Sequence, residues 1–256
     1  MATWVLLRGL MREQRHWGDF PARMARAMPG AQIITLDMPG NGSAWRDASP
    51  TRVAGMVDAC RAELRQRRCS GPFHLLALSL GAMVAAEWGA RHAHEIAGAV
   101  LINTSMRPLN RFGERLRWQN YPALLRGALF ASASEQAALI LRLTSRDPAR
   151  HAGVLADWLA WQAECPVSRA NMLRQLLAAA RFRAPADKPA YPVLVVGAGG
   201  DRLVDVRCSH TLAQRWRAPM VVHPSAGHDL PLDEGDWLAQ QVQAWHAGLS
   251  AGACRP

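Results

Sequence analysis

Short apolar runs alternate along the chain with longer stretches in which apolar residues recur at helical spacing. The runs are rich in leucine and β-branched residues, which is typical of strands. The alternation indicates strand–helix–strand units that build a parallel sheet with both faces covered. Six strands are predicted, at residues 4–7, 32–36, 74–78, 99–102, 193–196 and 220–223.

Apolar stripes between these strands predict the covering helices. They run over residues 17–27, 53–64 and 238–249. Ser49 and Pro50 are predicted to be the N-cap and first residue of the second of these helices. The expected fold class is therefore α/β, with a doubly wound, mostly parallel six-stranded sheet.

The alternation stops between residues 106 and 191, which contain helical stripes at 139–143, 155–162 and, after a predicted cap at Ser168, 172–177. A connection this long far exceeds the roughly 2 to 6 residues usual between a strand and a helix. We therefore expect residues 106–191 to form a helical cap, inserted into a core made of 1–105 and 192–256. Such an insert can roof a ligand site at the carboxyl ends of the strands.

The distribution of charge and of cysteines argues against a nucleic-acid-binding protein and against a metal site. The formal charge is +10, but its 30 basic residues include one lysine, Lys188, and the arginines are spread over the whole length. The densest stretch, 61–68, is interrupted by Glu63 and Gln66, so it indicates a solvated helix face and no nucleic-acid partner. The five cysteines show no metal-ligand spacing, which predicts reduced thiols and no metal.

The sequence also predicts a cytoplasmic protein without a membrane span. No apolar run reaches the roughly 18 residues that a span needs. The amino terminus enters an apolar segment at Thr3 without a charged lead or a cleavage site. We expect a monomer or a homodimer.

The strongest candidate for chemistry is a serine at the end of the third predicted strand. Residues 74–86 run from this strand through Ser79 into an alanine-rich helix. A turn this sharp strains the serine backbone and needs small neighbours two residues away on each side, here Ala77 and Gly81. The turn would lift the hydroxyl of Ser79 clear of the sheet and point the backbone N–H of Leu80 at a developing oxyanion.

This segment resembles the nucleophile elbow G-x-S-x-G of the α/β-hydrolase family, with Ala77 in place of the first glycine. Arg8-Gly9-Leu10 stands where the family usually carries His-Gly, and residues 37–43 look like its Asp-x-Pro-Gly-x-Gly-x-Ser turn. Residues 197–201 and 226–229 then follow the last two strands in the expected order. The resemblance extends from residue 4 to about residue 249.

The resemblance implies Ser79 as nucleophile, Asp201 as orienting acid, His228 as base, and the backbone N–H of Leu10 as the second oxyanion donor. A serine hydroxyl is a poor nucleophile until an imidazole takes its proton, and a carboxylate must orient that imidazole. Asp205 is the alternative acid. Some family members place the acid after the fourth strand, but this chain has Asn103 and Thr104 there.

Arg8 departs from the family pattern and leaves two interpretations open. It could hold its loop through carbonyl hydrogen bonds. Alone or with Arg12, it could instead bind a carboxylate or phosphate of the substrate.

The cap is rich in aromatic residues, of which Trp118, Trp158 and Trp161 are candidates for lining an acyl pocket; they could equally fill the core of the cap. Its many arginines are consistent with an acidic carrier such as coenzyme A or an acyl carrier protein, and equally with the arginine-rich composition of the whole chain.

These residues together predict a serine hydrolase that cleaves a small-molecule carboxylic ester through an acyl-enzyme intermediate, without a metal or organic cofactor. A thioesterase on acyl-coenzyme A or carrier-bound substrates is the alternative, and a carbon–carbon bond hydrolase or perhydrolase shares the fold. A non-catalytic ligand-binding protein would not need all three triad residues. An epoxide hydrolase or a halide-releasing hydrolase needs a carboxylate nucleophile at the elbow, and the serine at position 79 argues strongly against both.

Overall fold

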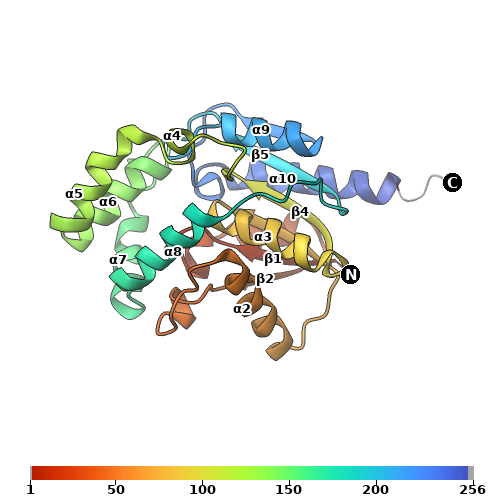
Figure 1. The fold of residues 1–256 in the computed structure, drawn as a ribbon, viewed down its shortest axis with the longest axis horizontal. Helices are drawn as coiled ribbons and strands as arrows, with labels where there is room; N and C mark the ends of the chain where they lie inside the picture. Colours follow the sequence, from red (N-terminus) through yellow and green to blue (C-terminus); the bar gives the residue numbers. More distant parts are fainter. Residues whose placement is uncertain (1, 253–256) are drawn as a thin grey trace.

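The computed structural model describes residues 2–252 and contains one six-stranded sheet in the order β2-β1-β3-β4-β5-β6, with every pair of neighbours parallel. All six predicted strands and the doubly wound fold class are confirmed (Figure 1). The strands are β1 (Thr3–Leu7), β2 (Gln32–Leu36), β3 (Phe73–Leu78), β4 (Ile96–Ile102), β5 (Val193–Ala198) and β6 (Met220–His223).

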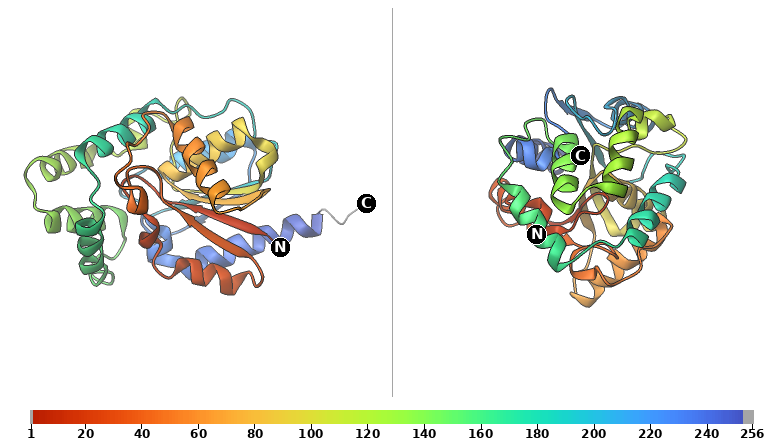
Figure 2. Two further views of the ribbon diagram at one scale, coloured as in Figure 1. Left: turned by 90° about the horizontal axis from the view of Figure 1, so that it is seen from below. Right: turned by 90° about the vertical axis from the view of Figure 1, so that its left-hand side faces the viewer.

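Helices cover both faces of the sheet. On one face α1 (Phe20–Ala27) and α10 (Leu230–Gly252) pack together, and on the other lie α2 (Val53–Gln66), α3 (Leu80–Arg91) and α9 (Arg207–Trp216). Figure 2 shows the red α1 and the blue α10 on one side of the sheet and the orange and yellow α2 and α3 on the other. Because both faces are buried, β5 is apolar and buried throughout and does not alternate.

The predicted start of α2 is wrong. The helix begins at Val53 with Arg52 as its N-cap residue. Ser49 is fully buried; its hydroxyl donates to the carbonyl of Pro39 (2.7 Å) and its amide to Asn171 Oδ1 of the cap (2.9 Å). The tertiary contacts of Ser49 therefore replace the local capping bond that its residue type favours.

Between β4 and β5 the chain forms a group of helices beyond the carboxyl ends of the strands (Figures 1 and 2), and this segment, predicted as a cap, is called the cap below. Ser168 caps its last helix, as predicted, by accepting a hydrogen bond from the amide of Asn171 (3.1 Å). The cap helices are α4 (Phe112–Arg115), α5 (Tyr121–Phe130), α6 (Ala133–Thr144), α7 (Val154–Glu164) and α8 (Arg169–Arg181). The short 3-10 helices are η1 (Gln14–Trp17), η2 (Gly42–Ala44), η3 (Ala93–Glu95) and, in the cap, η4 (Trp118–Asn120).

The described cysteines form no disulfide, and the described residues contain no metal site. Cys60, Cys69, Cys165 and Cys208 are free, and Cys254 lies outside the described residues. Burial raises the pKa of the Cys60 and Cys208 thiols to about 12, so both stay neutral. Within residues 2–252 no group of three or more His, Cys, Asp or Glu could hold a metal ion, and no described helix is long and apolar enough to span a membrane.

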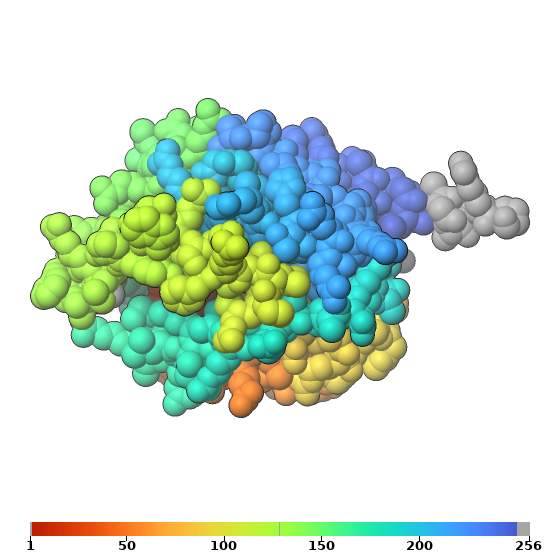
Figure 3. All heavy atoms as spheres, turned by 45° about the horizontal axis from the view of Figure 1, so that its top comes forward, coloured from red at the N-terminus to blue at the C-terminus, as the bar shows by residue number. Residues whose placement is uncertain are grey.

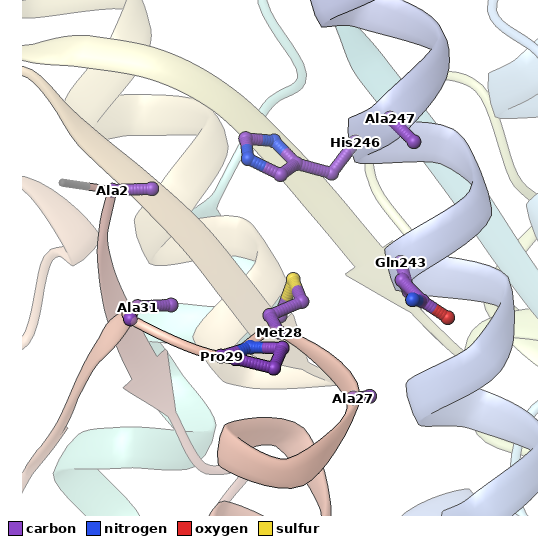
Figure 4. A pocket seen from close by; sticks show the side chains of 9 residues that line it. Ala2, Ala27, Met28, Pro29, Ala31, Gln243, His246 and Ala247 are labelled. Carbon is purple, nitrogen blue, oxygen red and sulfur yellow. The ribbon is translucent and has the colours of Figure 1, made fainter.

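An open hollow of about 520 Å³ lies at the amino ends of the strands, between the turn that follows α1 and the helix α10 (Figure 4). Ala2 and Ala31, which precede β1 and β2, are among its lining residues. The hollow therefore lies at the edge of the sheet opposite the cap, away from the candidate catalytic residues.

Candidate active site

Ser79 lies in a strained turn between β3 and α3. Its backbone has φ 58° and ψ −114°, a conformation that a residue with a side chain rarely adopts. A Cβ at Gly81 would lie 2.4 Å from the carbonyl oxygen of Leu7, so only glycine allows the elbow to pack this closely on β1. The strained serine sits at the carboxyl end of a central strand, where ligands bind in folds of this class.

Asp201 and His228 are joined by a buried hydrogen bond of 2.7 Å between Asp201 Oδ2 and His228 Nδ1. The other carboxylate oxygen of Asp201 accepts bonds from the amides of Leu203 (2.8 Å) and Val204 (2.9 Å), which fixes the carboxylate. The alternative acid, Asp205, instead pairs with Arg207. Asp201 is thus positioned to hold the imidazole with Nε2 available for a proton.

Two buried polar residues after β4 connect the serine turn with the histidine loop. Thr104 Oγ1 donates to the carbonyl of Ser79 (3.0 Å), and Asn103 Nδ2 donates to the carbonyl of His228 (2.9 Å). Among the described residues no hydrogen bond joins Ser79 Oγ to His228 itself. The structure therefore brings Asp201 and His228 into direct contact, with Ser79 on the turn beside them. In the sequence, Asn103 and Thr104 mark only a place where a carboxylate is absent.

The loop after β1 runs beside the serine. A Cβ on Gly9 would lie 3.2 Å from Ser79 Cβ, which shows how closely the two turns approach. The backbone amides of Leu10 and Leu80, the predicted oxyanion donors, have no acceptor among the described residues. The amide of Met11, in a left-handed conformation (φ 54°), donates to Gln175 Oε1 of α8 (2.8 Å). A residue of the cap therefore helps to set the shape of this loop.

Arg8 is paired within the chain. Its two terminal nitrogens donate to the two oxygens of Asp229, at 3.0 and 2.6 Å, and its side chain is only 2% exposed. Burial alone would raise the pKa of Asp229, but the charge and hydrogen bonds of Arg8, with Arg12 nearby, hold that pKa below its usual value. The pairing favours a role in positioning the histidine loop over the predicted contact with a substrate anion.

The three candidate tryptophans of the cap are not grouped. Trp158 and Trp161 of α7 face the loop after β1, where the Arg12 guanidinium lies 3.9 Å from the ring centre of Trp158 and His16 packs on both rings. Trp118 is 65% exposed in η4, and no ring contact among the described residues joins it to the other two. In Figure 3 the yellow-green and teal segments of the cap border a recess in which dark red atoms of the amino-terminal segment are visible.

Solved structures with this fold include a candidate non-heme bromoperoxidase, BpoC, from Mycobacterium tuberculosis (TM-score 0.77, 20% identity, 97% of this chain and 92% of that chain covered). A candidate lipase from Acinetobacter baumannii superposes with TM-score 0.77 at 18% identity, covering 98% of this chain and 85% of that one. An esterase, RhEst1, from a Rhodococcus species gives TM-score 0.75 at 18% identity, covering 95% and 90%.

No curated protein matches this chain. The model of the alpha/beta hydrolase family matches residues 4–241, which include the serine turn, Asp201 and His228. The chain therefore belongs to the alpha/beta hydrolase family.

Proposed function

We propose that the protein is a serine hydrolase that cleaves carboxylic esters, with Ser79 as nucleophile, His228 as base and Asp201 as the acid that orients it. The observation that carries the proposal is the buried 2.7 Å hydrogen bond between Asp201 and His228. It commits Nδ1 to the carboxylate and leaves Nε2 to exchange a proton with a nucleophile on the adjoining turn. Similar structures named as an esterase and a candidate lipase are consistent with ester substrates.

In this mechanism Ser79 Oγ attacks the ester carbonyl while His228 Nε2 takes the hydroxyl proton. The amides of Leu10 and Leu80 donate hydrogen bonds to the oxyanion, and the imidazolium returns its proton to the departing alcohol. Water, deprotonated by His228, then hydrolyses the acyl-enzyme and releases Ser79. Asp201 stays ionised throughout and stabilises the imidazolium. The cap, residues 106–191, roofs the acyl group.

Labelling with a fluorophosphonate tests the nucleophile, and hydrolysis of nitrophenyl esters of graded chain length tests the reaction. Ser79→Ala should abolish labelling and lower kcat at least about a thousandfold, because the triad acts as a unit. Ser105→Ala is the matched control, since Ser105 follows the neighbouring strand and, among the described residues, its hydroxyl donates a single hydrogen bond, to the carbonyl of Arg115. Absence of both labelling and ester hydrolysis in the wild type would refute the proposal.

A parallel panel of acyl-coenzyme A thioesters addresses the alternative substrate class. Both reactions use the same acyl-enzyme chemistry, so Ser79→Ala should remove both. Preference for the thioesters by a factor of ten or more in kcat/KM would replace the ester assignment and leave the proposed triad unchanged.

A further inference from the structure

Arg12, two residues after Leu10, forms no ion pair with a carboxylate among the described residues. Its guanidinium stacks on Trp158 at 3.9 Å, and its Nη2 atom is buried without a hydrogen-bond partner among the described residues. Asp229 is close enough to act on it, but both oxygens of Asp229 already bind Arg8. Burial lowers the pKa of Arg12 to about 10, partly offset by Asp229, so the side chain remains charged at neutral pH.

His16 provides a second donor beside Arg12. Its Nδ1 accepts a hydrogen bond from the amide of Glu13 (3.2 Å), so the ring proton lies on Nε2. Burial, reinforced by the charges of Arg12 and Arg8, lowers the pKa of His16 far below its usual value and keeps the imidazole neutral. Nε2 has no hydrogen-bond partner among the described residues, so His16 offers an N–H without a charge.

The acidic residues nearby are already paired. Glu13 binds the guanidinium of Arg15, and Asp229 binds Arg8. Arg8, Asp229 and Arg12 together leave one positive charge, next to the N–H donors of Arg12 and His16. A carboxylate supplies one negative charge and accepts two hydrogen bonds, which matches this arrangement.

The two donors are rigidly held beside the catalytic residues. Arg12 closes a turn by donating its amide to the carbonyl of Gly9 (3.3 Å), and Gly9 contacts Ser79. His16 lies in η1, which is anchored where the amide of Gln14 donates to Asp37 Oδ1 (2.7 Å). The ring contacts with Trp158 and Trp161 place α7 of the cap over both donors.

From this geometry we propose that Arg12 and His16 form a subsite for a free carboxylate on the substrate. The subsite rests on the esterase function proposed above. It makes the expected substrates esters that carry a second, ionised carboxyl group, such as monoesters of dicarboxylic acids. The carboxylate binds without covalent change and directs the ester group toward Ser79.

Monomethyl glutarate and its neutral counterpart dimethyl glutarate test the subsite when initial hydrolysis rates are compared. Arg12→Gln should raise KM for the monoester by about 10- to 100-fold, the range expected for a lost charge-assisted hydrogen bond, and change KM for the diester less than about threefold. Arg12→Lys retains the charge and should recover part of the affinity. His16→Phe keeps a ring against α7 but lacks the N–H, so it should raise KM for the monoester by a smaller factor.

Arg15→Gln is the matched control. Arg15 also lies over a tryptophan of α7, Trp161, at 5.4 Å, but its guanidinium is already paired with two carboxylates, those of Glu13 and Glu164. It should leave the preference for the monoester unchanged. Equal increases in KM for both esters in Arg12→Gln would overturn the subsite and leave the esterase function standing.

A binding measurement separates failure of the subsite from failure of the enzyme. Calorimetric titration of Ser79→Ala with monomethyl glutarate should show binding that Arg12→Gln, added to the same variant, weakens at least tenfold. This result would support the subsite even if the wild type neither hydrolysed an ester nor reacted with a fluorophosphonate. Equal affinity of Ser79→Ala for monomethyl and dimethyl glutarate would refute it.

Discussion

Replacing Arg8 by methionine should strongly destabilise the protein. The side chains of Arg8 and Asp229 are 2% and 4% exposed and share two hydrogen bonds, so the substitution leaves a buried carboxylate without its partner. Breaking such a pair costs about 3–5 kcal/mol, and the nearby charge of Arg12 should keep the cost near the lower value. In a chain of this length, a loss of about 3 kcal/mol corresponds to a melting temperature lower by roughly 6–12 °C.

Removing both charges should lower the free energy of unfolding far less than removing one. Arg8→Met combined with Asp229→Leu fills a similar volume with apolar atoms, and such replacements of buried ion pairs are often neutral or stabilising. Urea denaturation of the wild type, both single variants and the double variant gives the coupling free energy, which we expect to be about 2–3 kcal/mol.

An exposed ion pair provides the control for this cycle. Arg67 and Glu63 are 38% and 40% exposed, so Arg67→Met should cost less than about 1 kcal/mol. A loss below about 0.5 kcal/mol in Arg8→Met, or additive effects in the double variant, would show that the two side chains are not energetically coupled.

Two further predictions concern the serine turn and acid stability. Ser79→Gly should abolish labelling yet raise the free energy of unfolding by about 1 kcal/mol, because glycine relieves the strain at φ 58°; a melting temperature no higher than that of Ser79→Ala would contradict this. Hydrogen bonds from Arg61, opposed by burial and aided by Trp88, lower the pKa of Glu95 from its usual 4.5 to about 2. Its contribution to stability should therefore be complete above pH 4.5 and be lost as the pH falls toward 2. In urea titrations across this range, Glu95→Gln should be less stable than the wild type at pH 7 and show a smaller loss on acidification; equal slopes would exclude the role of Glu95.

The strands and the serine turn could be predicted from sequence because their signals are local. A strand buried on both faces needs a continuous apolar run, and a serine turn of this shape needs small residues such as Ala77 and Gly81 beside it. The order of the motifs along the chain then indicated Asp201 as the acid and His228 as the base. The bond between Asp201 and His228 spans 27 positions and joins residues that each follow a strand end.

Partners of buried polar residues could not be predicted in the same way. Arg8 and Asp229 are 221 positions apart, and nothing in either local sequence identifies the other. Ser49 has the residue type of a helix cap, yet Pro39 and Asn171 use its polar groups. Trp118 and Trp158 look alike in sequence, but Trp118 is exposed and Trp158 is buried. In each case the burial and the partners of the side chain depend on which residues, distant in sequence, the fold packs beside it.

Arg8 and Asp229 form a buried ion pair in which each side chain compensates the charge of the other. This pairing explains why Arg12 has no carboxylate partner among the described residues. A guanidinium this deeply buried needs an anion, which Asp229 supplies with both oxygens. Among the described residues Asp229 makes no hydrogen bond to Arg12, so the charge of Arg12 stays available for a ligand. Since Arg8→Met with Asp229→Leu removes one charge of each sign, the net charge around Arg12 is unchanged. The double variant should therefore keep the preference for monomethyl glutarate that Arg12→Gln alone loses.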